Sequence, residues 1–263
     1  MECTERAAAY WARLFPGKRA SLAETDPEFA GRFASFAFDE VVNSDGMDDR
    51  TRFLAILSAL LGCQGVELFQ EMVPAALNGG MTPVEVKEIV YQAAAYLGLG
   101  RVYPFLAAAN RALAAAGAAL PLEGQETTDL ETRLEAGNQV QVDIFGEGMR
   151  GFQDSGPEES RRINRWLAAN CFGDYYTRKG LDLRRRELVT FCLLAALGGC
   201  EPQLVSHAAG NLRVGNGKET LISAICQCLP YIGYPRSLNA LRCVQQAAEQ
   251  ARREEPEQKE EET

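Results

Sequence analysis

The sequence has very little histidine: His207 is the only one among 263 residues. Its eight cysteines include no pair separated by two residues, and together with one histidine they cannot supply the closely spaced ligands of a structural zinc site. The cysteines are also sparse for a disulfide scaffold, and a chain of this length does not need such cross-links. We therefore expect reduced cysteines, no metal and no cofactor. Any imidazole chemistry must use His207.

Basic residues and long apolar segments are also in short supply. Lys and Arg number 27 against 36 Asp and Glu, and the net charge of -9 opposes attraction to nucleic acid or to an anionic membrane surface. Apolar runs such as 53–61 stop far short of the roughly 18 residues that suggest a membrane-spanning helix. The first residues, MECTERAAAYW, lack a signal-peptide pattern. We expect a cytoplasmic protein that acts on a small molecule, with neither nucleic acid nor a membrane as a partner.

Helical periodicity, in contrast, runs through the whole sequence. Apolar residues recur at spacings of three and four, which is the helical period, and no comparable alternation supports strands. Helix start signals such as Thr82, Pro83 and Glu85, and stop signals such as Gly98, agree with this interpretation. The sequence therefore predicts an all-α fold. The helices predicted in the first half and just beyond it are 5–14, 27–42, 50–61, 66–77, 83–97, 102–115 and 129–144.

The second half of the sequence repeats the first. LGCQGVELFQ, which ends at Gln70, aligns with GGCEPQLVSH, which ends at His207, and YQAAAYLGLGR, which ends at Arg101, aligns with CQCLPYIGYPR, which ends at Arg236. The copies are offset by 137 residues in the first alignment and by 135 in the second. A repeat of this length predicts a duplicated helical module. We expect two domains, 1–120 and 121–250, followed by a disordered acidic tail at 251–263.

Only the second copy carries a complete set of reactive side chains: Glu187, Cys200 and His207. Cys200 is predicted to begin a helix, where unpaired backbone N–H groups and the helix dipole favour a thiolate, so we expect a lowered thiol pKa despite the neighbouring Glu201. His207 follows on roughly the same helical face, about 10 Å along the axis. If the preceding helix folds back as a hairpin, Glu187 lies within one or two turns of His207 and can orient the imidazole.

Simpler explanations for these three residues stay open at this point. A single histidine on a helix is more often a hydrogen-bonded core residue, a glutamate after three arginines is by default a surface acid, and a cysteine is by default a small buried hydrophobe. In the first copy, Gln70 stands at the histidine position and Arg50 at the glutamate position, which leaves Cys63 alone. We therefore expect the first copy to be structural, unless Asp49 takes the place of the glutamate.

These features resemble the carboxymuconolactone decarboxylase family, which is related to alkylhydroperoxidase D. The resemblance rests on Arg186-Glu187-Leu188, on a predicted helix that ends in Gly-Gly-Cys at Cys200, on His207, and on the segments 230–236 and 239–241. It covers residues 48–113 and 171–244 of the sequence. It implies an all-helical module of the alkylhydroperoxidase D-like type in two tandem copies. It also implies a homo-oligomer, such as a trimer, with sites near subunit or module interfaces.

The resemblance also extends to individual residues of the predicted site. Peroxide-reducing members use a glutamate, a Cys-x-x-Cys pair and a histidine, and Glu187, Cys200 and His207 match three of these groups. Gln203 stands where the second cysteine belongs. An intramolecular dithiol cycle therefore lacks its second thiol at this position, and an external thiol or a partner such as Cys192 or Cys171 is needed.

Three functions follow from these residues. The leading expectation is a thiol-dependent, peroxide-reducing oxidoreductase, with Cys200 as the redox thiol and with His207 and Glu187 as its proton relay. The second is a decarboxylase-type lyase, in which His207 acts as general acid or base on a small carboxylated lactone and Arg178 or Arg236 binds the acidic substrate. The third is an oligomeric binding protein without catalytic activity.

Overall fold

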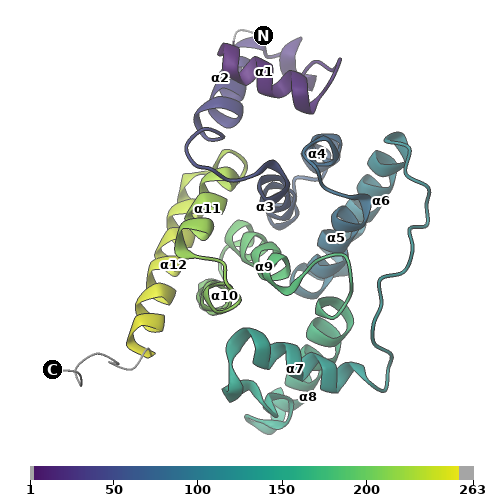
Figure 1. Ribbon diagram of the computed structural model, residues 1–263, viewed down its shortest axis with the longest axis vertical. Helices are drawn as coiled ribbons and strands as arrows, with labels where there is room; N and C mark the ends of the chain where they lie inside the picture. The colour runs from purple at the N-terminus through teal and green to yellow at the C-terminus, as the bar shows by residue number, and fades with distance from the viewer. Residues whose placement is uncertain (1–2, 255–263) are drawn as a thin grey trace, which may run out of the picture.

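The computed structural model describes residues 3–254, and all regular structure in that range is helical (Figure 1). The predicted all-α class is confirmed. No helix among these residues is long and apolar enough to cross a membrane. The helices are α1 (Glu5–Leu14), α2 (Pro27–Ser35), α3 (Asp49–Gly62), α4 (Val66–Asn78), α5 (Pro83–Leu97), α6 (Leu99–Ala115), α7 (Arg133–Phe145), α8 (Glu158–Trp166), α9 (Leu183–Leu197), α10 (Glu201–Arg213), α11 (Lys218–Ile232) and α12 (Tyr234–Glu254). Most of the predicted tail, 251–263, lies outside the described residues, and 251–254 belong to α12.

The two copies of the module share one helix register. α4, α5 and α6 begin 135 residues before α10, α11 and α12. Gly65 is the N-cap of α4 and Cys200 is the N-cap of α10, so these two residues correspond. The predicted pairing of Cys63 with Cys200, at an offset of 137, is therefore wrong. Three residues separate α3 from α4, and three also separate α9 from α10. The turns before α4 and α10 therefore have the same length, and a two-residue change of offset has no place there.

This register places apolar residues in the first copy where the second copy has polar ones. His207 corresponds to Met72, and because α3 and α9 begin 134 residues apart at equivalent aspartate N-caps, Glu187 corresponds to Phe53. Met72 and Phe53 are both buried. The first copy therefore has an apolar pair in place of an acid and an imidazole. The residues predicted for these positions, Gln70 and Arg50, are not the equivalents.

The centre of the molecule is α3 packed against α9, one helix from each copy (Figure 1). α5 and α6 flank this pair on one side, and α11 and α12 flank it on the other. Side chains of both copies form one hydrophobic core, in which Phe53, Leu57 and Phe191 are fully buried. Each such burial stabilises the fold by about 1.5–3 kcal/mol. Because the core is shared, side chains of the first copy stand within reach of the second copy's polar residues.

A π-helical segment, η5 (Leu167–Tyr176), packs closely against α7. A β-carbon on Gly137 would lie 1.9 Å from the Ala168 carbonyl oxygen, and one on Gly173 would lie 2.1 Å from the Arg133 carbonyl oxygen. Only glycine allows backbones to approach this closely. The contact fixes η5, and with it the position of Tyr176 at its last turn. π-helical turns are rare and occur frequently at functional sites.

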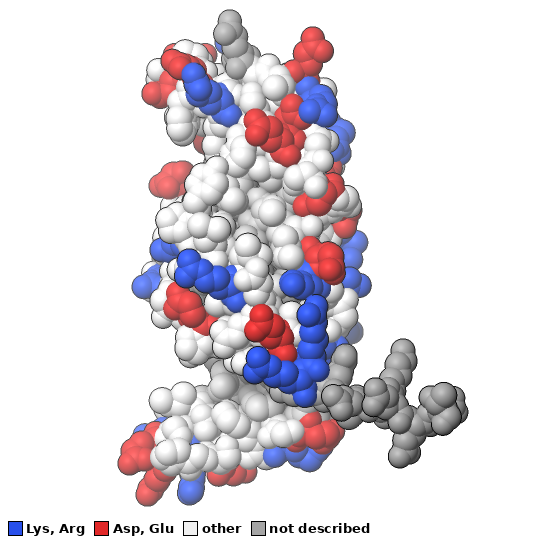
Figure 2. All heavy atoms as spheres, turned by 90° about the vertical axis from the view of Figure 1, so that its left-hand side faces the viewer, with Lys and Arg blue, Asp and Glu red and all other residues white. Residues whose placement is uncertain are grey.

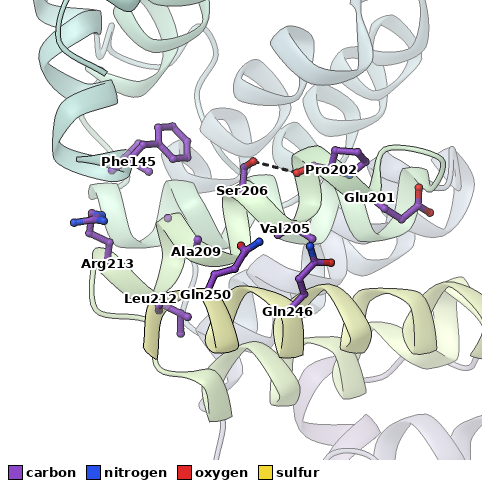
Figure 3. A pocket seen from close by; sticks show the side chains of 13 residues that line it. Phe145, Glu201, Pro202, Val205, Ser206, Ala209, Leu212, Arg213, Gln246 and Gln250 are labelled. Carbon is purple, nitrogen blue, oxygen red and sulfur yellow. Dashed lines mark hydrogen bonds between the residues drawn. The ribbon is translucent and has the colours of Figure 1, made fainter. Parts of the chain in front are cut away.

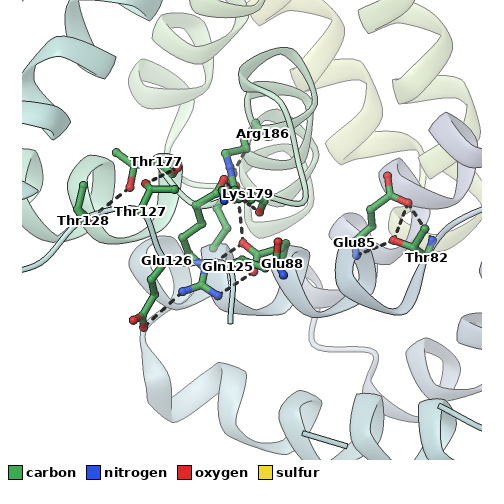
Figure 4. Close-up of polar contacts among 12 residues, drawn as sticks. Thr82, Glu85, Glu88, Gln125, Glu126, Thr127, Thr128, Thr177, Lys179 and Arg186 are labelled. Atoms are coloured by element: carbon green, nitrogen blue, oxygen red, sulfur yellow. Dashed lines mark hydrogen bonds and ion pairs between the residues drawn. The ribbon is translucent and has the colours of Figure 1, made fainter. Parts of the chain in front are cut away.

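The extended connection between α6 and α7 runs along the outside of the second copy, where the Lys179 backbone N–H donates to the Gln125 carbonyl oxygen at 2.9 Å (Figure 4). Beside this contact, Glu88 of α5 accepts ion pairs from two arginines of the second copy. The N–O distance is 2.9 Å for both Arg178 and Arg186, and Glu88 and Arg186 are almost fully buried. These ion pairs join the copies in a defined register.

The face on the side of α11 and α12 carries charges of both signs around a largely uncharged centre (Figure 2). Tyr234 and Leu238, in the first two turns of α12, are exposed large side chains. Leu99 and Tyr103 occupy the equivalent positions in α6 and are exposed as well. Both copies therefore present an apolar pair to the surroundings at the start of their last helix.

Candidate active site

An acid–imidazole pair lies between α9 and α10. Glu187 Oε2 is 2.9 Å from His207 Nδ1, and Glu187 is fully buried. Asn211, one turn after the histidine, donates its side-chain N–H to the Glu187 backbone oxygen at 3.0 Å and to the His207 backbone oxygen at 2.7 Å. These bonds hold α10 against α9. The structure therefore brings together two of the three predicted site residues.

The other oxygen of the carboxylate is occupied as well. Tyr176 donates its hydroxyl to Glu187 Oε1 at 2.8 Å. A carboxylate that accepts bonds through both oxygens is held in a fixed orientation, and donors favour its ionised form. With Nδ1 of His207 bound to this acid, Nε2 is the ring nitrogen left for a substrate.

Aromatic rings enclose the imidazole on two sides. The ring of Tyr96, from α5 of the first copy, has its centroid 5.5 Å from that of His207, and the Phe145 ring, from the end of α7, has its centroid at 5.4 Å. Gly210 lies against the carboxylate of the pair, because a β-carbon there would lie 2.8 Å from Glu187 Oε2. His207 is 7% exposed. The imidazole is thus packed in mostly apolar surroundings with little exposure to bulk water, and there charge–charge interactions are strong.

The third predicted residue, Cys200, makes its contacts elsewhere. Its thiol donates to the Leu194 carbonyl oxygen at 3.6 Å, and it borders a very small cavity with Arg236 and Asn239. Burial raises the pKa of the Cys200 thiol, and the charge of Glu201 raises it further, whereas Arg236 lowers it. The predicted lowering of this pKa is therefore wrong: desolvation is the largest influence on the thiol, and the Cys200 side chain makes no capping bond to the first turn of α10. Cys200 is therefore a half-buried thiol with a raised pKa.

The two arginines predicted to bind an acidic substrate differ in their surroundings. Arg178 is committed to structure, because it forms ion pairs with Glu88 and Glu126 (Figure 4). Arg236 has a buried Nη1 without a hydrogen-bond partner among the described residues, and this atom faces Gly198. The structure thus uses Arg178 in ion pairs, whereas it leaves one buried nitrogen of Arg236 without a partner among the described residues.

Sequence reasoning missed the hydroxyl side chains around Glu187. No local pattern marked Tyr96 or Tyr176 as a hydroxyl that meets the acid, and Tyr176 lies in a π-helical segment. Cys171 also lies in this region, and burial raises its pKa to about 12, so it stays a thiol. Among residues 3–254, no group of three or more His, Cys, Asp or Glu side chains could hold a metal ion.

A hollow of about 940 Å³ lies along α10, and His207 is not among the residues that line it. Figure 3 shows the hollow with the side chains around it. Gln246 and Gln250 reach towards it from α12, and Arg213 stands at its end. Phe145 and Gly210 line this hollow and also contact the acid–imidazole pair. These two residues therefore lie between the hollow and the acid–imidazole pair.

A family model for the carboxymuconolactone decarboxylase family matches residues 27–118 and 162–246. The first segment runs from α2 to just beyond α6, and the second runs from within α8 to within α12. The match therefore covers both copies of the module, in agreement with the predicted duplication.

Two known proteins are similar to parts or all of this chain. The 4-carboxymuconolactone decarboxylase of Acinetobacter baylyi (strain ATCC 33305 / BD413 / ADP1) is 28% identical over 121 residues, which is 44% of this chain and 87% of that protein. A crystal structure of a chain assigned as a gamma-carboxymuconolactone decarboxylase subunit, from Burkholderia xenovorans LB400, is 20% identical, covers 94% of this chain and 97% of its own, and has a TM-score of 0.48.

Proposed function

The chain belongs to the carboxymuconolactone decarboxylase family, and we propose that it is a carboxy-lyase acting on a small carboxylated lactone, with His207 as the general acid. The observation that supports this reaction is the buried Glu187–His207 pair, with its 2.9 Å contact. A relative named as a decarboxylase supports an enzymatic role in general. The substrate class comes from the names of that relative and of the family.

The proposed reaction needs one proton at carbon. Loss of CO2 breaks the bond between the carboxylate and its neighbouring carbon and leaves the electron pair on that carbon. The protonated ring of His207 donates its Nε2 proton there and is reprotonated from solvent. Glu187 keeps Nδ1 protonated and stabilises the positive charge of the ring, and the apolar walls of Tyr96 and Phe145 strengthen this interaction by excluding water.

The peroxide-reducing activity that led the expectations from sequence has less support. It requires a thiolate, and burial and Glu201 raise the pKa of the Cys200 thiol. The Cys200 thiol donates to the Leu194 carbonyl oxygen and borders a small cavity with Arg236, and neither contact involves His207. A binding protein without catalytic activity is also less favoured, because Glu187 and His207 point towards one another.

We further propose that the protein assembles as a homo-oligomer through the exposed apolar pairs of α6 and α12. Leu99 and Tyr103 are 60% and 68% exposed, and Tyr234 and Leu238 are 62% and 52% exposed. Apolar side chains repeated at equivalent positions of both copies suit an interface in which each copy meets a similar surface. Light scattering coupled to size-exclusion chromatography tests this assembly.

The activity is tested by offering two substrates to the same preparation. 4-Carboxymuconolactone is supplied in one assay, with CO2 release and loss of the lactone as the readouts, and hydrogen peroxide with dithiothreitol is supplied in the other. The proposal predicts stoichiometric CO2 release that exceeds the uncatalysed rate by several orders of magnitude, and no peroxide consumption above the background of the reductant. Peroxide turnover without CO2 release overturns the proposal.

A further inference from the structure

Hydroxyl groups behind Glu187 form a chain that ends in the first copy of the module. The Tyr176 hydroxyl donates to Glu187 Oε1 and lies 2.6 Å from Thr190 Oγ1. The Tyr96 hydroxyl lies 2.9 Å from that of Tyr176, and Gln92 donates its side-chain N–H to Thr190 Oγ1 at 2.9 Å. Tyr96 and Gln92 both belong to α5, in the copy that lacks the acid–imidazole pair.

The direction of these bonds follows from the donors available. Gln92 donates to Thr190, so the Thr190 hydroxyl is free to donate to Tyr176, and the Tyr176 hydroxyl in turn donates to the carboxylate. Tyr96 can donate to the second lone pair of the Tyr176 oxygen. The three hydroxyl donors therefore all point along the chain towards Glu187, and the second amide hydrogen of Gln92 goes to the Arg186 carbonyl oxygen. Donors aligned in this way polarise one another, which strengthens the final bond to the carboxylate.

The titratable groups that face Glu187 are few. They are His207 from α10, Tyr176 and Cys171 from η5, and Tyr96 from α5, whereas α7 contributes the apolar residues Ile144 and Phe145. Burial raises the pKa of Tyr96 and of Tyr176 well above the usual tyrosine value. Both phenols therefore remain protonated donors over the working pH range.

We propose that Tyr176 is a positioning residue that holds the charge and orientation of the Glu187 carboxylate, and that Tyr96 from the first copy supports it, so that the first copy completes the site of the second. The inference deepens the proposed function, because it assigns new residues to the same acid–imidazole pair. It also explains why a copy without reactive groups keeps buried polar side chains on the face that meets η5 and α9.

The test uses the single histidine as its own probe. Carbon-13 and nitrogen-15 NMR of the labelled imidazole of His207 follow its titration without any need for activity. The Glu187–His207 pair carries a net negative charge before it takes up a proton and none after it. The phenol of Tyr176 stabilises this negative charge and therefore opposes protonation of the pair. In Tyr176→Phe the pair therefore takes up its proton more readily, and the midpoint of the imidazole titration rises by about one pH unit, as expected for loss of a hydrogen bond to a charged group.

Two further variants complete the test. Tyr96→Phe, one bond farther from the carboxylate, raises the midpoint by less than half as much, and Tyr175→Phe, the neighbouring tyrosine on η5, leaves it within 0.2 pH unit. If Tyr176→Phe does not fold, the rise in Tyr96→Phe relative to Tyr175→Phe decides the matter. Equal midpoints in Tyr176→Phe and wild type, or an equal shift in Tyr175→Phe, would overturn the inference.

Activity measurements separate this inference from the proposed function. If the protein releases CO2 from a carboxylated lactone, the alkaline limb of its pH–rate profile moves upwards in Tyr176→Phe by the same amount as the NMR midpoint, since the protonated imidazole is the proton donor. If it releases no CO2 but the midpoint still rises in Tyr176→Phe, the proposed reaction fails and the positioning role stands.

Discussion

Replacing Glu187 by glutamine removes a charge and leaves the shape of the side chain almost unchanged. The amide oxygen can still accept the Tyr176 hydroxyl, while the amide N–H must face His207 Nδ1. A donor at this position reverses the arrangement, because Nδ1 must then accept and the neutral ring carries its proton on Nε2. The substitution therefore alters the protonation of the imidazole more than it alters the packing.

The size of the effect follows from the geometry. The 2.9 Å contact places the centres of the two charges about 4 Å apart, and at an effective dielectric constant of about 20 their attraction is about 4 kcal/mol. At about 1.4 kcal/mol for each factor of ten, complete loss of this interaction corresponds to roughly three orders of magnitude. The new amide bond restores part of it. We therefore expect Glu187→Gln to lower kcat by about 100- to 1000-fold.

Two readouts are needed for this variant. Steady-state release of CO2 gives kcat and KM, and urea unfolding shows whether the fold is retained. We expect kcat of Glu187→Gln to fall while KM stays nearly unchanged, because Glu187 contacts the imidazole rather than the substrate. A variant that stays folded and keeps more than half of the wild-type kcat would refute it.

Two other predictions concern the thiol and the copy interface. Alkylation of Cys200 by iodoacetamide, followed by mass spectrometry of its peptide, should become half-maximal above about pH 8.5, because burial raises the thiol pKa; a plateau near pH 7 would contradict this. Arg186→Met leaves buried Glu88 with Arg178 as its remaining ion-pair partner and should lower the free energy of unfolding by about 3 kcal/mol in urea. A change below 0.5 kcal/mol would show that the pair does not join the copies.

The helical class and the duplication could be predicted because both depend on local patterns. Apolar spacing and capping residues such as Thr82 act within one or two turns, and the structure contains the predicted capping box. The alignment of Cys63 with Cys200 was wrong for a physical reason. Helix register is set by the N-caps, Gly65 and Cys200, whereas the repeated cysteine is a chance similarity in the turn.

The pairing of Glu187 with His207 could be predicted from the sequence, whereas the environment of Cys200 and the contacts of Tyr176 could not. Glu187 and His207 are brought together by a hairpin of two successive helices, whose geometry follows from spacing alone. The environment of Cys200 depends on burial by other elements, and no local pattern contains that information. The contact of Tyr176 with Tyr96 spans 80 residues and depends on the packing of η5 against α5 and α7. Such contacts become visible only in the folded molecule.

The most direct test of the account is a side-by-side measurement of decarboxylation by His207→Gln and Cys200→Ser, each compared with wild type. If the imidazole supplies the proton, kcat falls at least 100-fold in His207→Gln and stays within a factor of three of wild type in Cys200→Ser. Equal losses in the two variants, or a loss in Cys200→Ser alone, would contradict the assignment of the chemistry to the Glu187–His207 pair.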